Sequence, residues 1–309
     1  ARGGRGRRSG RTAEMGWFIG LPGGASVVAR KGSLVAVHFD LHSLEVGSQS
    51  IVIADQVGDF VGPGFRMAST SAGGDIALAT RAEDAPTDFA WTDRHGVRGA
   101  PLGMAQAFSS TLLSPDGSHA VGSRTDPTDG LEVVWTADLA RRTAAPLTHS
   151  QNDSYDPVWS PDGQRIAFGN RALGTDDLYL QAASGATPKQ LRWSARPCDA
   201  DPRDWSHDGR WLFFEGRPRS GARHQQIWAL DLQTDSARVI LQEDFDLAAP
   251  CLSPDGRWLA YLSTESGRTD LFVRSFPDLQ RKWQVSNGGA SAPHWRADGR
   301  ELLFLNATP

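Results

Sequence analysis

Short apolar runs recur along the chain, and each follows a turn that contains Asp-Gly. The runs that follow the clearest turns read "RIAF", "RWLFF", "RWLAY" and "ELLFL". Both alternating faces of such a segment are apolar, as in strands that are covered on two sides by neighbouring sheets. The pattern therefore predicts short β-strands within sheets that pack face to face.

The turns return at a nearly constant spacing. Five copies are clear: Asp116-Gly117, Asp162-Gly163, Asp208-Gly209, Asp255-Gly256 and Asp298-Gly299. Degenerate copies lie near Gly24 and Gly74. From Gly74 onward the glycines are 43, 46, 46, 47 and 43 residues apart. In these turns Asp can accept a hydrogen bond from the backbone two residues on, and Gly supplies a positive φ. A period of 40–50 residues with a fixed internal mark indicates a propeller or another repeat array.

Each period has room for four strands and no helix. Third strands are expected at "LEVVWTADL", "DLYLQA", "QIWALDL" and "DLFVRSF", and short fourth strands at "APLTH", "KQLR", "ARVIL" and "KWQVS". Four-stranded antiparallel sheets at this period build propeller blades. We predict an all-β propeller over residues 21–309 after a basic, disordered leader at 1–20. Six blades result if the last strands pair with residues 33–39 and 50–55, and seven blades or an incompletely closed array is the alternative.

Composition supports this fold class and limits the partners. The 309 residues include 33 Gly, 18 Pro and 11 Trp, and the net charge is −4. Turn-forming and aromatic residues favour β structure, and the mild acidity gives no reason to expect a nucleic-acid partner. No apolar run approaches the length of a membrane helix, so we expect no membrane insertion of this segment. The two cysteines, Cys198 and Cys251, are expected to be buried thiols or thiols without a chemical role.

The repeat, with its "VWSPDGQRIAF" and "CLSPDGRWLAY" copies, resembles the TolB-type propeller repeat. Together with residues 25–57 and the segment "RKWQVSNGGASAPHWRADGRELLFL", it is also similar to the C-terminal propeller of bacterial, acidobacterial-type serine/threonine protein kinases. The resemblance spans about residues 25–305 and implies a propeller fold. Because propellers have many unrelated functions, it implies much less about activity.

We find no catalytic motif in the sequence. The kinase motifs and the G-x-S-x-G pentapeptide of α/β-hydrolases do not occur. His38 and His42 lie four residues apart on a predicted strand and its exit, about 13 Å, too far for one zinc ion. We therefore expect no metal, no cofactor and no enzymatic activity from this segment.

The segments that lead into the first strands of successive blades are acidic. They contain "NDSYDP", "CDADPRDW" and "EDFDLAAP", which would gather around one mouth of the central channel. Asp156, Asp204 and Asp246, with His294 before Trp295, are the candidate binding residues there. The simpler interpretation is solvated loop surface for the carboxylates and a structural role for the histidine. Trp159, Trp205 and Trp295 are expected to pack between blades.

These observations favour a monomeric, non-catalytic module that binds a protein or small ligand at the propeller face. The kinase-propeller resemblance implies the extracytoplasmic sensor or scaffold part of a larger bacterial signalling protein, although a cytoplasmic location stays open. The alternative is the substrate-gating propeller of a prolyl-oligopeptidase-type hydrolase, or a propeller lyase.

Overall fold

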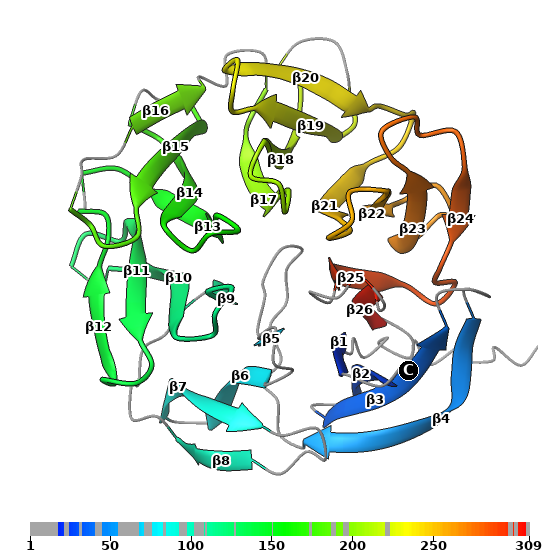
Figure 1. Cartoon of the computed structure of the whole chain (residues 1–309), viewed down its shortest axis with the longest axis horizontal. Helices are drawn as coiled ribbons and strands as arrows, with labels where there is room; N and C mark the ends of the chain where they lie inside the picture. The colour runs from blue at the N-terminus through cyan, green and yellow to red at the C-terminus, as the bar shows by residue number, and fades with distance from the viewer. Residues whose placement is uncertain are drawn as a thin grey trace, which may run out of the picture.

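The computed structural model shows antiparallel sheets arranged one after another around a ring (Figure 1). It describes the backbone of the strands between residues 18 and 101. It also describes residues 108–306 apart from 109, 127, 150, 173–174, 187–189, 194–197, 220–222, 296–298 and 300–301. Side chains are described only from residue 108 onward.

The strands have the following bounds. The first three sheets comprise β1 Phe18–Leu21, β2 Ala25–Arg30, β3 Ser33–Asp40, β4 Glu45–Ala54; β5 Ala68–Thr70, β6 Ile76–Ala82, β7 Ala85–Thr92, β8 Arg98–Pro101; and β9 Ser110–Leu113, β10 His119–Thr125, β11 Glu132–Asp138, β12 Thr143–Pro146. The next three comprise β13 Ser154–Trp159, β14 Arg165–Asn170, β15 Asp177–Ala182, β16 Gln190–Trp193; β17 Asp201–Trp205, β18 Trp211–Gly216, β19 Gln226–Asp231, β20 Ser236–Leu241; and β21 Leu247–Leu252, β22 Trp258–Ser263, β23 Asp270–Ser275, β24 Lys282–Gln284. The last sheet has two strands, β25 Ala290–Trp295 and β26 Leu302–Asn306.

This architecture confirms the predicted all-β class with four-stranded antiparallel sheets. In each four-stranded sheet the strands are neighbours in sequence order, so short turns suffice for every connection. Figure 1 places β13, β17, β21 and β25 on the inner side of the ring, with β16, β20 and β24 outside. Within the described part of the chain, no helix is long and apolar enough to cross a membrane.

The repeated turn has the same geometry in four copies, and the one at Asp162-Gly163 illustrates it. The Gly163 amide donates to the Ser160 carbonyl at 2.9 Å, and the Ser160 hydroxyl donates to Asp162 Oδ1 at 2.5 Å. Gly163 has φ +68°, and Gly117, Gly209, Gly256 and Gly299 lie between +69° and +75°. This left-handed conformation is open to glycine at little cost, which explains its recurrence at the turn. Gly24, Gly74 and Asp298 lie outside the described residues.

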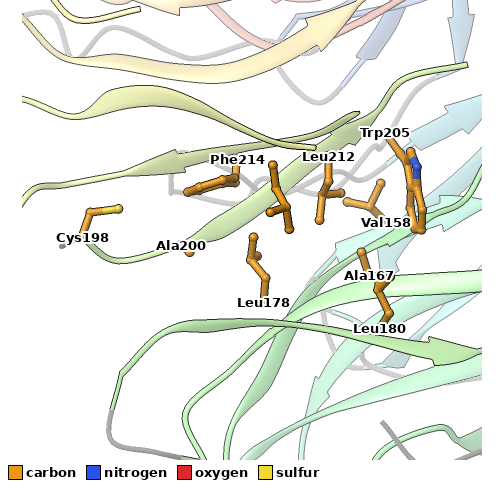
Figure 2. Packing of buried hydrophobic residues seen from close by; sticks show 10 residues of the cluster. Val158, Ala167, Leu178, Leu180, Cys198, Ala200, Trp205, Leu212 and Phe214 are labelled. Carbon is orange, nitrogen blue, oxygen red and sulfur yellow. The ribbon is translucent and has the colours of Figure 1, made fainter. Parts of the chain in front are cut away.

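Neighbouring sheets pack through their apolar faces. Figure 2 shows the contact between the β13–β16 and β17–β20 sheets, where Leu178 and Val158 lie against Leu212, Phe214 and Trp205. The other described junctions are built in the same way from buried aliphatic and aromatic side chains. Burial on both faces of the second and third strands accounts for the continuous apolar runs in the sequence.

The tryptophans before the turns join the sheets, as predicted. Trp159 Nε1 donates to the Leu112 carbonyl of the preceding sheet at 3.2 Å, and Trp295 Nε1 donates to the Cys251 carbonyl at 3.0 Å. Trp205 packs among residues of the β13–β16 sheet while its Nε1 donates to Gly209 of its own turn. Cys198 and Cys251 are buried and form no disulfide, and burial raises the pKa of the Cys198 thiol to about 12.

The closing strands differ from the expected arrangement. The sequence pattern predicts that the last strands pair with residues 33–39 and 50–55, but β3 pairs with β2 and β4, so both of its edges are occupied. Among the described strands, β26 pairs with β25 and lies against β1 and β2. β1 begins at Phe18, inside the segment predicted to be a leader, because "FIGL" and "ASVVAR" supply the first two strands of this sheet. The pairing that supported six blades is therefore wrong. The described strands form six four-stranded sheets and one two-stranded sheet, and the number of blades stays a prediction.

Candidate functional site

The loops that enter the first strands lie at one edge of the sheets. Because the strands alternate in direction, this edge also carries the loops between second and third strands, and the Asp-Gly turns lie at the opposite edge. We call it the entry edge. The predicted candidates Asp156, Asp204 and Asp246 lie in or beside the strands that begin there, β13, β17 and β21.

Asp156 belongs to a partly buried ionic cluster that connects two sheets. Its Oδ2 lies 2.7 Å from Nη1 of Arg203, whose side chain is only 11% exposed. Arg203 also donates to Glu215 of β18, and Asp201 Oδ2 lies 3.9 Å from Arg203 Nη2. We refer to Asp156, Asp201, Arg203 and Glu215 as the Arg203 cluster.

The Arg203 cluster also reaches a third sheet. Glu215 Oε2 accepts a hydrogen bond from the Ala249 amide of β21 at 2.9 Å. Ala249 lies where the β21–β22 register shifts, and its φ is +47°. A bulge takes a residue out of the ladder, so its amide needs another acceptor when it is buried. Glu215 supplies that acceptor from the neighbouring sheet.

Asp204 strengthens the same junction. Its Oδ2 accepts a hydrogen bond from the Leu252 amide at 2.7 Å, so it connects β17 with the end of β21. The sequence pattern predicts Asp204 as a binding residue at the channel mouth. In the structure it joins two sheets, which is a structural use of the carboxylate.

A second polar group lies next to the Arg203 cluster. The Tyr155 hydroxyl donates to Asp176 Oδ1 at 2.6 Å, and Arg171 Nε donates to the same oxygen at 2.5 Å. The Arg171 guanidinium also lies over the Tyr155 ring, 4.9 Å from its centroid, and contacts Asp153. The pKa of Tyr155 is raised, mainly by burial and secondly by the hydrogen bond to Asp176.

Asp201 has an unusual ionisation. Its pKa is raised to about 7, mainly by burial. The charge of Arg203 opposes this shift, and the charges of Asp156, Glu215 and Asp176 add to it. Three carboxylates face one guanidinium in the Arg203 cluster, so full ionisation of all three leaves negative charge unbalanced. The cluster is therefore suited to holding a proton near neutral pH.

Asp246 lies in a more accessible setting. Its side chain is 41% exposed, accepts the Gln225 amide at 2.8 Å, and lies 3.5 Å from Arg217 and 3.7 Å from His224 Nδ1. Nearby on the same edge, Asp199 pairs with Arg219 at 2.8 Å, and both side chains are more than two-fifths exposed. These residues form an exposed band of both charges along the entry edge.

The structure does not gather the four predicted residues into one group. Asp156, Asp204 and Asp246 bond to Arg203, the Leu252 amide and the Gln225 amide respectively. His294 lies half-buried in β25, opposite Leu303. Among the described residues, no group of three or more His, Cys, Asp or Glu side chains is placed to hold a metal ion.

Sequence reasoning missed Arg203 and Glu215, although the repeat contained a signal. Trp159, Trp205, Leu252 and Trp295 occupy the same position in four copies of the repeat. The residue two places earlier is proline in three of these copies, whereas the copy that contains Trp205 has Arg203. Glu215 likewise takes the position of Gly169 and Leu262. Two charged residues of opposite sign at positions that are otherwise apolar or glycine indicate a buried pair.

Comparison with known proteins agrees with the ring of sheets. Residues 102–298 match the family model of the TolB beta propeller domain. The uncharacterized protein Atu1656 of Agrobacterium fabrum is 23% identical over 211 residues, which cover 64% of this chain and 69% of that protein. The uncharacterized peptidase YuxL of Bacillus subtilis is 21% identical over 186 residues, which cover 48% of this chain but 28% of the peptidase.

A solved structure shows the same fold at low identity. The structure described as TolB from Agrobacterium tumefaciens superimposes with a TM-score of 0.65 at 17% identity, covering 88% of this chain and 96% of that one. The family match extends over more than half of the sequence and includes four of the five clear Asp-Gly turns and Asp298 of the fifth. The chain therefore belongs to the TolB β-propeller family.

Proposed function

We propose that this chain is a non-catalytic binding module that holds a protein or small charged ligand at the entry edge of its ring. The observation that carries the proposal is the exposed band of Asp199, Arg219, Asp246, Arg217 and His224. These side chains come from loops of two adjacent sheets and are exposed by about two-fifths or more. Exposed charges of both signs on a rigid ring favour recognition of a partner by charge complementarity.

In the parent protein we propose a sensor or scaffold role within a bacterial signalling protein, with an extracytoplasmic location. The support is the resemblance of the repeat to kinase-linked propellers, together with membership in the TolB β-propeller family. Fold alone does not fix a role, so the complete reading frame provides the direct check. A kinase domain and a membrane span in the same frame are the expected finding.

Calorimetric titration with a Lys/Arg-rich peptide, and separately with Ca²⁺, tests binding at the entry edge. We expect at least one of the two to bind at low salt, with affinity that falls as salt is raised. The double variant Asp199→Asn/Asp246→Asn should weaken binding and leave the fold intact, because exposed ion pairs contribute little to stability. Asp156 and Asp204 are unsuitable test positions, because both carboxylates join sheets and their loss would disturb the fold.

The control is Asp138→Asn/Asp235→Asn, which removes the same number of carboxylates from the opposite edge of the sheets. The control should bind like the parent protein. If neither probe binds the parent, or if both double variants lose affinity equally, the band is solvated surface and the proposal is wrong.

A second candidate function is the propeller of a larger hydrolase. The observation that favours it is the similarity to the peptidase YuxL, of which the matched segment is 28%. In that case the catalytic residues would belong to a separate domain of the parent protein. A G-x-S-x-G domain in the complete reading frame would support this candidate over the signalling role.

A further inference from the structure

The Arg203 cluster connects the inner strands of three consecutive sheets through side chains. No backbone ladder joins these sheets, because β13, β17 and β21 each begin a separate described sheet. Arg203 and Glu215 are 11% and 6% exposed, while Asp156 and Asp201 are 24% and 30% exposed. The nearly buried Arg203 guanidinium therefore faces two carboxylates, those of Asp156 and Asp201, that solvent can still reach. Glu215 connects the cluster with the third sheet because it accepts the hydrogen bond from the Ala249 amide.

Asp201 differs from the other two carboxylates in its distance from the arginine. Asp156 and Glu215 make direct hydrogen-bonded ion pairs with Arg203, whereas Asp201 Oδ2 lies 3.9 Å from Nη2, beyond hydrogen-bond range. When all three ionise, Asp201 adds a third negative charge that faces the single guanidinium from a greater distance. The charge balance of the cluster thus depends on whether Asp201 carries a proton.

We propose that the Arg203 cluster is a proton-controlled clasp, that is, a connection between three sheets whose strength depends on whether Asp201 is protonated. When Asp201 is protonated, Arg203 is fully paired with Asp156 and Glu215, and the inner strands are held together. When Asp201 is ionised, this connection is weaker. The proton exchanges directly with solvent through the exposed part of the Asp201 side chain. No other group needs to gain or lose a proton in this step.

The surroundings of Asp201 support a switch in the neutral range. The charged and titratable groups that interact electrostatically with Asp201 come from β13, the β14–β15 connection, the segment before β17, and β17 and β18 themselves: Tyr155, Asp156, Asp176, Cys198, Arg203 and Glu215. Arg171 pairs with Asp176 of this set, and Asp199 precedes Asp201 by two residues. β21 contains one titratable residue, Cys251, whose side chain is buried in the apolar cluster with β25 and β26. Burial first, and then the carboxylates of this set against the opposing effect of Arg203, raise the pKa of Asp201 to about 7.

The direction of the pH effect follows from the raised pKa. An unfolded aspartate ionises near 3.8. Between that value and about 7 the folded chain keeps a proton that the unfolded chain releases, so stability falls as pH rises through this window. Above about pH 7 the contribution of protonated Asp201 to stability is fully lost. Below pH 3.8 Asp201 is protonated in both the folded and the unfolded chain.

Chemical unfolding at pH 5.5 and pH 8 tests the clasp with the variant Asp201→Asn, which resembles the protonated side chain. We expect the unfolding constant of the parent to rise between the two pH values by about 10- to 30-fold more than that of the variant. Asp235→Asn, an exposed turn residue at the opposite edge, is the control and should keep the pH dependence of the parent. Equal pH dependence of the parent and Asp201→Asn, within about twofold, overturns the proposal.

Two measurements on the unmodified protein keep the test independent of variant folding. The ¹³C resonance of the Asp201 carboxyl group should titrate with a midpoint between about 6 and 8, and a midpoint near 4 overturns the proposal. The hydrogen-exchange protection factor of the Ala249 amide reports the bond to Glu215, and it should fall as pH rises through the same range. A constant protection factor from pH 5.5 to pH 8 shows that Asp201 does not control the clasp.

Discussion

Replacement of Arg203 by methionine isolates the contribution of the Arg203 cluster to stability. Methionine keeps an unbranched apolar chain of similar length but removes the charge that pairs Asp156 and Glu215. Glu215 is 6% exposed and would become a buried, unpaired carboxylate. Removal of one partner from a buried ion pair typically costs about 3–5 kcal/mol. Because Asp156 and Asp201 retain access to water, we expect the lower end, about 3 kcal/mol.

Urea unfolding followed by tryptophan fluorescence measures this loss, with the slope of the transition compared between variants. The matched control is Arg257→Met, since the Arg257 side chain is 75% exposed beside Asp255 and should contribute less than about 1 kcal/mol. The double variant Arg203→Met/Glu215→Gln removes both charges and keeps an acceptor for the Ala249 amide. It should be more stable than the sum of the single changes predicts, by about 1 kcal/mol or more. A loss for Arg203→Met no larger than that of the control refutes the role of the cluster as a connection between sheets.

Two further predictions concern the repeated turns. Gly256 has φ +70° and open space where a Cβ would lie, so Gly256→Val should lower the free energy of unfolding by about 1–3 kcal/mol through backbone strain alone. Thermal or urea unfolding checks this, and Gly256→Asn, which tolerates the left-handed region better, should lose clearly less; equal losses would argue against strain as the cause. The pKa of Asp116 is lowered to about 2, first by the Ser114 hydroxyl and then by the Ser118 amide and hydroxyl, so its contribution is present above pH 3.8 and is lost as pH falls toward 2. Asp116→Asn should therefore reduce the loss of stability between pH 4 and pH 2, and an acid-unfolding profile parallel to that of the parent would contradict this assignment.

The turns and the sheet type could be predicted from the sequence because their causes are local. Ser160, Asp162 and Gly163 form their hydrogen bonds within a few residues, so the motif itself specifies the bend and the positive φ. The apolar runs after each turn likewise required burial on both faces, whatever their neighbours were. Repetition of these local rules at a constant period was enough to indicate a propeller.

The ring closure depended on competition between strands, which the local pattern does not decide. Residues 33–39 are apolar enough to pair with either β2 or β26, and β2 lies next to them in sequence. Pairing with β2 needs only a short connection, so it costs little loop entropy. The sequence pattern therefore located β3 but did not identify its partner.

The Arg203 cluster was decided by the tertiary structure alone. Asp156, Arg203, Glu215 and Ala249 are separated by up to 93 positions along the chain and meet only when three sheets stand side by side. From the sequence, the acidic entry segments could be recognised but not sorted into carboxylates that connect sheets, such as Asp156 and Asp204, and exposed groups, such as Asp246. Burial and the position of one arginine make that distinction, because a carboxylate's role depends on the charge it faces and the water it retains.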